Sequence, residues 1–190
     1  MRTATINRKT KETDINLTLC LDGGEVKVDT GVGFFDHMLT AFAMHAGYGL
    51  TVTCKGDIEV DCHHTVEDIG IVLGQALYEC LGDKSNLVRY GSFFVPMDEA
   101  LGFCAVDICN SAYTVFEANF PQEKCGDFDV CMCVEFFRAV ADNAKITVHL
   151  RAPYGDNSHH IAEAIFKAFG HAMSIATEKT DKTLSTKGTL

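Results

Sequence analysis

Two adjacent histidines followed by a glutamate are the strongest chemical signal in the chain. His63 and Glu67 are four positions apart, so on a helix they lie one above the other on the same face and can hold one metal ion together. His64 lies roughly 100° further round the helix axis and must point to a different centre. The spacing therefore predicts a helix end that contacts two metal centres.

The same pattern occurs again 96 residues later (159 − 63 = 96). His159, His160 and Glu163 repeat the spacing, and flanking positions match at the same offset, among them Gly74 with Gly170. Each copy follows a strand-like run and opens an apolar helix. Chance similarity of two amphipathic segments is the weaker explanation. We infer an internal duplication into two halves of roughly 95 residues.

Hydrophobic periodicity predicts the elements that must position these residues. Period-two alternation and turn residues predict strands at residues 2–8, 13–21, 25–29, 50–55, 89–96, 101–108, 113–119 and 146–151. Apolar residues at helical spacing, with glycine stops, predict helices at residues 34–46, 65–81, 128–142 and 158–177.

Strands precede helices in each half, which predicts an α+β fold. We expect internally duplicated halves, each a mostly antiparallel sheet with helices packed on one face. One domain should cover residues 1–190, made of halves at about 1–88 and 89–178 and a polar tail at 179–190. Because each half is short for an independent domain, we expect the two to pack against each other.

Composition excludes several classes of protein. The formal net charge of −10 argues against nucleic acid as a partner. No run is long and apolar enough for a membrane span, and no secretory signal is visible. The nine cysteines without an export signal are expected to be free thiols in the cytoplasm.

Histidines are concentrated in three places. Six of the eight lie in short clusters: His37 with His45, His63 with His64, and His159 with His160. Imidazole with carboxylate suits manganese, iron or zinc better than calcium or magnesium. Both His-His-x-x-Glu helices can share two metals, within one chain or across a subunit boundary. For the lone His149 and His171, an ordinary surface or core position is an equal or simpler explanation.

Other polar residues are open to two interpretations. Arg89 and Lys187, if they converge, can hold a phosphate group with help from the Ser185 hydroxyl. Taken alone, a lysine in a polar tail is a solvated charge, and Glu12 would pass as a surface residue. Two further functions are compatible with the metal residues: a dinuclear hydrolase that uses a metal-bound hydroxide, and a non-catalytic metal-storage or shell protein.

Five motifs occur in order along the whole chain: Gly-Phe-Phe-Asp-His-Met-Leu at 33–39, His-His-Thr-Val-Glu-Asp at 63–68, Pro-Met-Asp-Glu-Ala at 96–100, Asn-Ser-His-His with its glutamate at 157–163, and Ser-Thr-Lys-Gly at 185–188. With these motifs the chain resembles the imidazoleglycerol-phosphate dehydratases of L-histidine biosynthesis. The resemblance implies a hydro-lyase that converts imidazole glycerol phosphate to imidazole acetol phosphate and water. It also implies two Mn²⁺ ions per active site and a homo-oligomer of 24 subunits with sites between subunits.

The resemblance also implies roles for individual residues. The implied metal ligands are His37, His63, His64, Glu67, Glu135, His159, His160 and Glu163. The implied substrate contacts are Glu12, His45, Arg89, Ser185 and Lys187. A carboxylate must move the proton from carbon, so the implied catalytic groups are Glu12, Glu67 and Glu163, together with His45. The sequence does not choose among the three glutamates.

One position departs from the family pattern. The family has an arginine that grips phosphate where this chain has Ser111, in the run from Asp107 to Ala112. Loss of a charged contact to phosphate costs on the order of 1.5–3 kcal/mol. Another basic group must replace the arginine, or the substrate binds more weakly.

Overall fold

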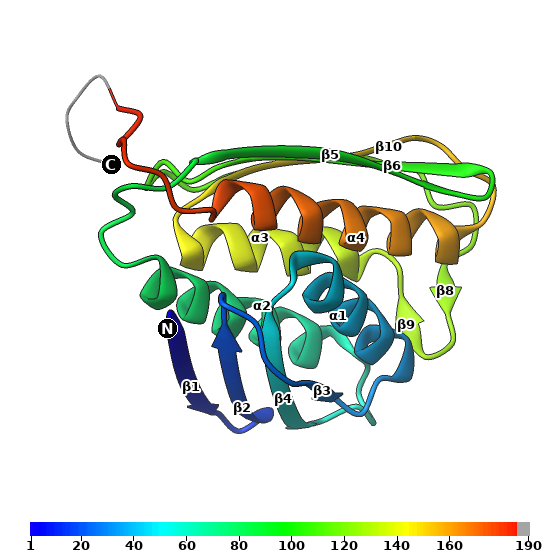
Figure 1. The fold of residues 1–190 in the computed structure, drawn as a ribbon. Coiled ribbons are helices and arrows are strands. Elements are labelled where there is room, and N and C mark those ends of the chain that lie inside the picture. The colour runs from blue at the N-terminus through cyan, green and yellow to red at the C-terminus, as the bar shows by residue number, and fades with distance from the viewer. Residues whose placement is uncertain (186–190) are drawn as a thin grey trace.

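Four helices lie between two four-stranded sheets in a computed structural model that describes residues 1–185 (Figure 1). The helices α1 and α2 cover the first sheet, and α3 and α4 cover the second. The two helix layers then pack on each other, α1 against α4 and α2 against α3. Each sheet is therefore covered on one face, and the two halves share one core.

The two halves have the same order of elements. The first contains β1 (Thr3–Lys9), β2 (Thr13–Cys20), β3 (Val26–Asp29), α1 (Gly33–Ala46), β4 (Gly49–Gly56) and α2 (His63–Leu81). The second contains β5 (Tyr90–Met97), β6 (Ala100–Asp107), β7 (Tyr113–Ala118), α3 (Met132–Ala144), β10 (Thr147–Tyr154) and α4 (Ser158–Ala176). The strand orders β1-β2-β4-β3 and β5-β6-β10-β7 correspond, and only the β3–β4 and β7–β10 pairs are parallel among these strands. The predicted duplicated α+β fold is confirmed.

Alternation along the strands builds the core. In β2, Ile15, Leu17 and Leu19 are buried while Asn16 points outward, as period-two patterning requires. Aromatic rings then join the two halves: those of Phe35 and Phe136, for example, meet edge to face at 5.3 Å. Among residues 1–185, no helix combines the length and apolar character needed to cross a bilayer.

The expected helix at residues 128–142 begins too early. A short hairpin of β8 (Lys124–Cys125) and β9 (Phe128–Asp129) precedes it, and α3 starts at Met132. Gly126 supplies the left-handed turn residue, with φ of 61°. Phe128 is buried from this hairpin, where its ring stacks on Phe35 at 5.7 Å. The apolar side chain of Phe128 fits the helical pattern, but Phe128 enters the core from strand β9 and not from the helix.

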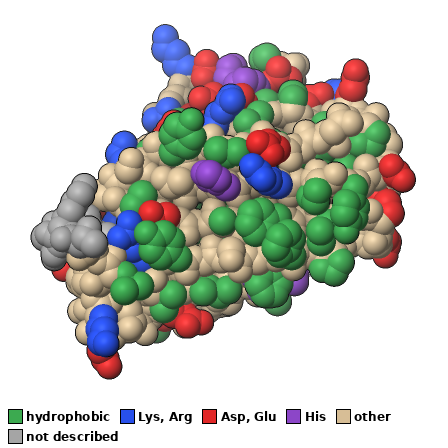
Figure 2. Space-filling view, turned by 90° about the horizontal axis from the view of Figure 1, so that it is seen from above, with side chains coloured by type: hydrophobic (Ala, Val, Ile, Leu, Met, Phe, Trp, Pro, Cys, Tyr) green, Lys and Arg blue, Asp and Glu red, His purple; other side chains and the backbone are tan. Residues whose placement is uncertain are grey.

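Residues 1–185 leave the outer face of the second sheet uncovered. Figure 2 views the molecule from this side, and hydrophobic side chains gather on the surface there. Among the exposed aromatic residues of its strands are Phe94, Tyr113 and Tyr154. An exposed apolar surface of this kind is a common site of association between proteins.

Glycines set the distance between the helix layers, and two of them occupy equivalent positions in the two halves. A Cβ on Gly74 of α2 would lie 2.7 Å from the carbonyl oxygen of Val140 in α3. A Cβ on Gly170 of α4 would lie 2.6 Å from the carbonyl oxygen of Phe42 in α1. The two contacts occupy equivalent places in the two halves. A residue of α3 is therefore numbered 98 above its counterpart in α1 (140 − 42 = 98), and a residue of α4 is numbered 96 above its counterpart in α2 (170 − 74 = 96).

We expect Gly74→Ala to lower the free energy of unfolding by about 1–3 kcal/mol, because the added methyl group would overpack the α2–α3 contact. Gly33→Ala is the control: a Cβ at Gly33 meets nothing within 4 Å, and alanine is the better helix former. Urea denaturation would measure both. Equal stability of Gly74→Ala and the unmodified protein would show that the helix layers can separate at no cost.

Candidate metal centre and substrate site

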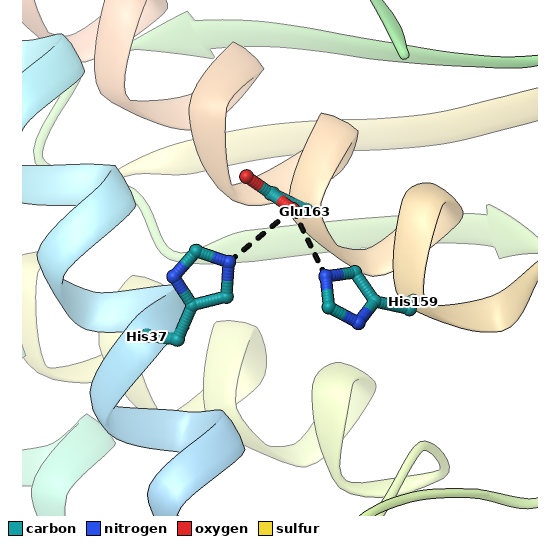
Figure 3. A group of neighbouring side chains, drawn as sticks. All are labelled: His37, His159 and Glu163. Atoms are coloured by element: carbon teal, nitrogen blue, oxygen red, sulfur yellow. Dashed lines mark hydrogen bonds and ion pairs between the residues drawn. The ribbon is translucent and has the colours of Figure 1, made fainter. Parts of the chain in front are cut away.

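Three side chains converge where α1 meets α4 (Figure 3). His37 comes from α1, and His159 and Glu163 come from successive turns of α4; one ligand atom of each lies within 4.8 Å of the other two. Oε2 of Glu163 is 3.3 Å from Nε2 of His37 and 3.1 Å from Nε2 of His159. Two imidazole nitrogens and one carboxylate oxygen thus face a common point, and α1 and α4 belong to different halves.

Glu163 is held as a carboxylate at this point. Its side chain is buried, and its second oxygen, Oε1, accepts a hydrogen bond from Lys167 Nζ at 2.9 Å. Burial raises the pKa of Glu163, but the hydrogen bond and charge of Lys167, together with His37, outweigh it and lower the pKa below its ordinary value. The two carboxylate oxygens therefore have separate partners, and Oε2 is left for the histidines.

The corresponding group in the other helix pair is looser. His63 Nε2 and Glu67 Oε2 are 3.3 Å apart on α2, as their spacing predicts. The counterpart of His37 on α3 is Glu135 (37 + 98 = 135), and Glu135 Oε1 is 3.0 Å from Arg138 Nη1. Within residues 1–185, only the His37 group has three ligand atoms so close together. Glu135 stays a predicted ligand.

The second histidine of each pair points away, as the helical geometry requires. His64 Nδ1 is 2.9 Å from Asp57 Oδ2, and its Nε2 is 3.8 Å from Glu12 Oε1. His160 Nδ1 is 2.8 Å from Glu99 Oε2. The hydrogen bonds to Asp57 and Glu99 raise the pKa of His64 and His160, respectively, and the bond from His160 lowers the pKa of Glu99 to about 2.

Sequence reasoning did not single out Glu99 as a functional residue. Glu12 immediately precedes β2 and Glu99 immediately precedes β6, so they occupy equivalent turns of the two halves. Each lies beside the second histidine of its own half, His64 or His160. The duplication itself was the signal that could have identified Glu99.

Arg89 links the start of β5 to the C-terminal segment. Its Nε lies 2.7 Å from Asp107 Oδ1, and its Nη1 donates to the carbonyl oxygen of Leu184. Ser185 is therefore next in the chain to a contact of Arg89, and its role at the phosphate stays a prediction. Lys187 lies outside the described residues.

Lys84, whose ammonium reaches the loop of Ser111, is not free to replace the expected arginine. The Ser111 carbonyl oxygen accepts a hydrogen bond from Thr147. Lys84 is buried, and its Nζ donates to Asn110 Oδ1 at 3.2 Å and to the carbonyl oxygens of Ala144 and Lys145. The Lys84 charge therefore interacts with carbonyl oxygens at the C-terminal end of α3.

The predicted site residues do not all meet within one chain. The backbone N–H of Arg89 donates to the carbonyl of Ala176, which is 13 residues beyond Glu163 on α4 (176 − 163 = 13). At 1.5 Å per residue, these positions are roughly 20 Å apart along the helix axis. The group of His37, His159 and Glu163 and the Arg89 corner of one chain are therefore too far apart for one small substrate.

Comparisons with known proteins identify the family. The family model described as imidazoleglycerol-phosphate dehydratase matches residues 30–173. The chain belongs to this family. Imidazoleglycerol-phosphate dehydratases from Acetivibrio thermocellus and from a strain of Bacillus thuringiensis are 55% and 54% identical to it, over 97% and 100% of both chains, respectively.

Solved structures agree with this assignment. The dehydratase of Staphylococcus aureus is 43% identical with a TM-score of 0.86, covering 94% of this chain and 99% of its own. That of Pyrococcus furiosus, in complex with (S)-C348, is 38% identical with a TM-score of 0.86, covering 97% and 100%. The resemblance found in the motifs is confirmed, and the protein is a hydro-lyase of histidine biosynthesis.

We expect Arg89→Gln to raise the rate of trypsin cleavage after Lys182 about tenfold, because a hydrogen bond from a charged donor contributes roughly 1.5–3 kcal/mol and cleavage follows the open population. Mass spectrometry of timed digests would measure it. Arg151→Gln is the control, since Arg151 pairs with Glu117 on the second sheet. An unchanged rate in Arg89→Gln would mean that other contacts hold this segment.

Proposed function

We propose that this dehydratase converts imidazole glycerol phosphate to imidazole acetol phosphate and water, and that turnover requires two Mn²⁺ ions per active site. The observation that carries the proposal is the convergence of His37, His159 and Glu163 within 4.8 Å. This donor set suits manganese, iron or zinc. A bound metal would polarise the substrate as a Lewis acid.

The duplication suggests how the ligands divide. One set is His37, His159 and Glu163, and the equivalent set is His63, Glu67 and Glu135. In Glu135 a carboxylate takes the position of a histidine, and Arg138 offsets its charge at 3.0 Å. His64 and His160 point away from the sets on their own helices, so we assign them to metal sites completed by another subunit.

Sites between subunits of a homo-oligomer follow from this division. Under this assignment each metal also takes a histidine, His64 or His160, from another subunit, and Arg89 is roughly 20 Å along α4 from Glu163. The uncovered second sheet, with Phe94 and Tyr154 exposed, offers apolar surface for association (Figure 2). The family resemblance implies 24 subunits. All nine cysteines are unpaired, as we expect for a protein of the cytoplasm.

We assign the transfer of the proton from carbon to Glu12. Glu163 is engaged by Lys167, and Glu67 lies beside His63 as a metal ligand. Glu12 is half-exposed in a turn, with Oε1 3.8 Å from His64, so it can face substrate held at the metals. Arg89, Ser185 and Lys187, with His45, would bind the phosphate end.

Removal of metal with a chelator should abolish turnover, and Mn²⁺ should restore it.

We expect Glu163→Gln and Glu67→Gln each to lose bound manganese and to lower kcat more than about a hundredfold, because each removes a ligand. Glu117→Gln, on the second sheet, is the control. Metal content by mass spectrometry and product formation from imidazole glycerol phosphate are the measurements.

Each competing function predicts a different result. Full metal content and full activity in both glutamine variants would exclude the two-metal site. Release of inorganic phosphate without dehydration would indicate a hydrolase. Bound manganese with no turnover would indicate a storage or shell protein.

We expect Ser111→Arg to lower the KM for imidazole glycerol phosphate about tenfold, because it restores a charged contact to phosphate. Ser111→Gln, which adds bulk without charge, should leave the KM unchanged. Steady-state kinetics at fixed ionic strength would test both. If Ser111→Arg has no effect on KM, the phosphate is not bound from this loop.

A further inference from the structure

Two histidines outside the metal centre form a hydrogen-bonded pair. His45 Nδ1 in α1 is 2.9 Å from His171 Nε2 in α4. The ring of Phe93 in β5 stacks on His171, with centroids 4.2 Å apart and planes at 24°. Three elements thus fix the His171 ring, and the stacked Phe93 opposes its rotation.

The pair lies on the same helix face as the metal residues. His159, Glu163, Lys167 and His171 are each four residues apart, which puts them in one row along α4. His37 and His45 of α1 face this row at its two ends. The histidine pair therefore lies about 12 Å along the helix from Glu163 (8 residues at 1.5 Å).

Only one half of the molecule has this extension. At the equivalent positions α2 carries His63 and Glu67, followed by Ile71 and Gln75. The counterpart of His45 is Asn143 (45 + 98 = 143), whose side chain bonds to Ala139 of its own helix. The metal residues are duplicated and the far end of the row is not. A duplicated metal pair with one unduplicated end fits a substrate whose two ends differ, here imidazole and phosphate.

The chemistry of imidazole then limits the protonation of the pair. A neutral imidazole donates from one nitrogen and accepts at the other. Burial, followed by the charges of His171 and Lys167, lowers the pKa of His45, and burial lowers that of His171. Both rings are therefore neutral near pH 7, and one proton lies between Nδ1 of His45 and Nε2 of His171.

We propose that His171 is a positioning residue that donates its Nε2–H to His45, so that His45 keeps its own proton on Nε2 and presents it to the substrate phosphate. The dianion of a phosphate monoester only accepts hydrogen bonds, so the opposite tautomer of His45 would place a lone pair against this anion. The inference rests on the proposed function, in which His45 contacts the phosphate end of the substrate.

Three variants of the manganese-loaded enzyme test the proposal. His171→Leu removes the donor, and we expect the KM to rise about tenfold with kcat and manganese content nearly unchanged. His171→Gln keeps an amide N–H for His45 Nδ1 and should restore the KM to within about twofold. Gln75→Leu, the same change at the equivalent position of α2, is the matched control and should have no effect.

A spectroscopic reading separates this inference from the proposed function. The ¹⁵N chemical shifts of His45 should report the Nε2–H tautomer in the unmodified protein and in His171→Gln, and a mixture in His171→Leu. Inorganic phosphate, titrated as a probe, should bind more weakly to His171→Leu. If the unmodified enzyme does not dehydrate the substrate, the proposed function fails, while these two readings still test the pair. An unchanged tautomer in His171→Leu, or equal KM values for His171→Leu and His171→Gln, would overturn the positioning role.

Discussion

The site depends on close contact between helices of different halves. Gly170 lets α4 approach the backbone of α1 at Phe42, and this approach brings His37 within 3.3 Å of Glu163. Gly74 has the same role for α2 against α3. Each proposed metal set therefore draws its residues from both halves, and the core that stabilises the fold is also what assembles the ligands. A side chain at either glycine would separate the layers and the ligands together.

The adjacent histidines impose a second constraint. Residues i and i+1 of a helix point about 100° apart, so His63 and His64 cannot serve one centre, nor can His159 and His160. The second histidine of each pair is held instead by carboxylates of its own half, Asp57 or Glu99. These hydrogen bonds keep an imidazole oriented at the surface, as the proposed sharing of ligands between subunits requires.

Some parts of the molecule are present in both halves and others in only one. The duplicated parts are the sheets, the helix crossings and the His-His-x-x-Glu ends. The part that is not duplicated, Lys167 and the pair of His45 and His171, lies along a single seam between α1 and α4. Two similar proposed metal positions and one distinct polar extension suit a substrate with a nearly symmetric ring and a charged tail.

Much of this protein follows from its sequence. The duplicated α+β fold was predictable because strand alternation and helical stripes are local patterns and the 96-residue repeat is visible by comparing the chain with itself. The spacing of His159 and Glu163 likewise predicted their contact. The start of α3 was misplaced because Phe128 fits a helical stripe while it packs from a hairpin. Only the tertiary structure decided which helices face each other, that His45 meets His171 across 126 residues of chain, and that Arg89 holds the segment at Leu184. Such pairings depend on how distant surfaces pack, and spacing along the chain does not encode that.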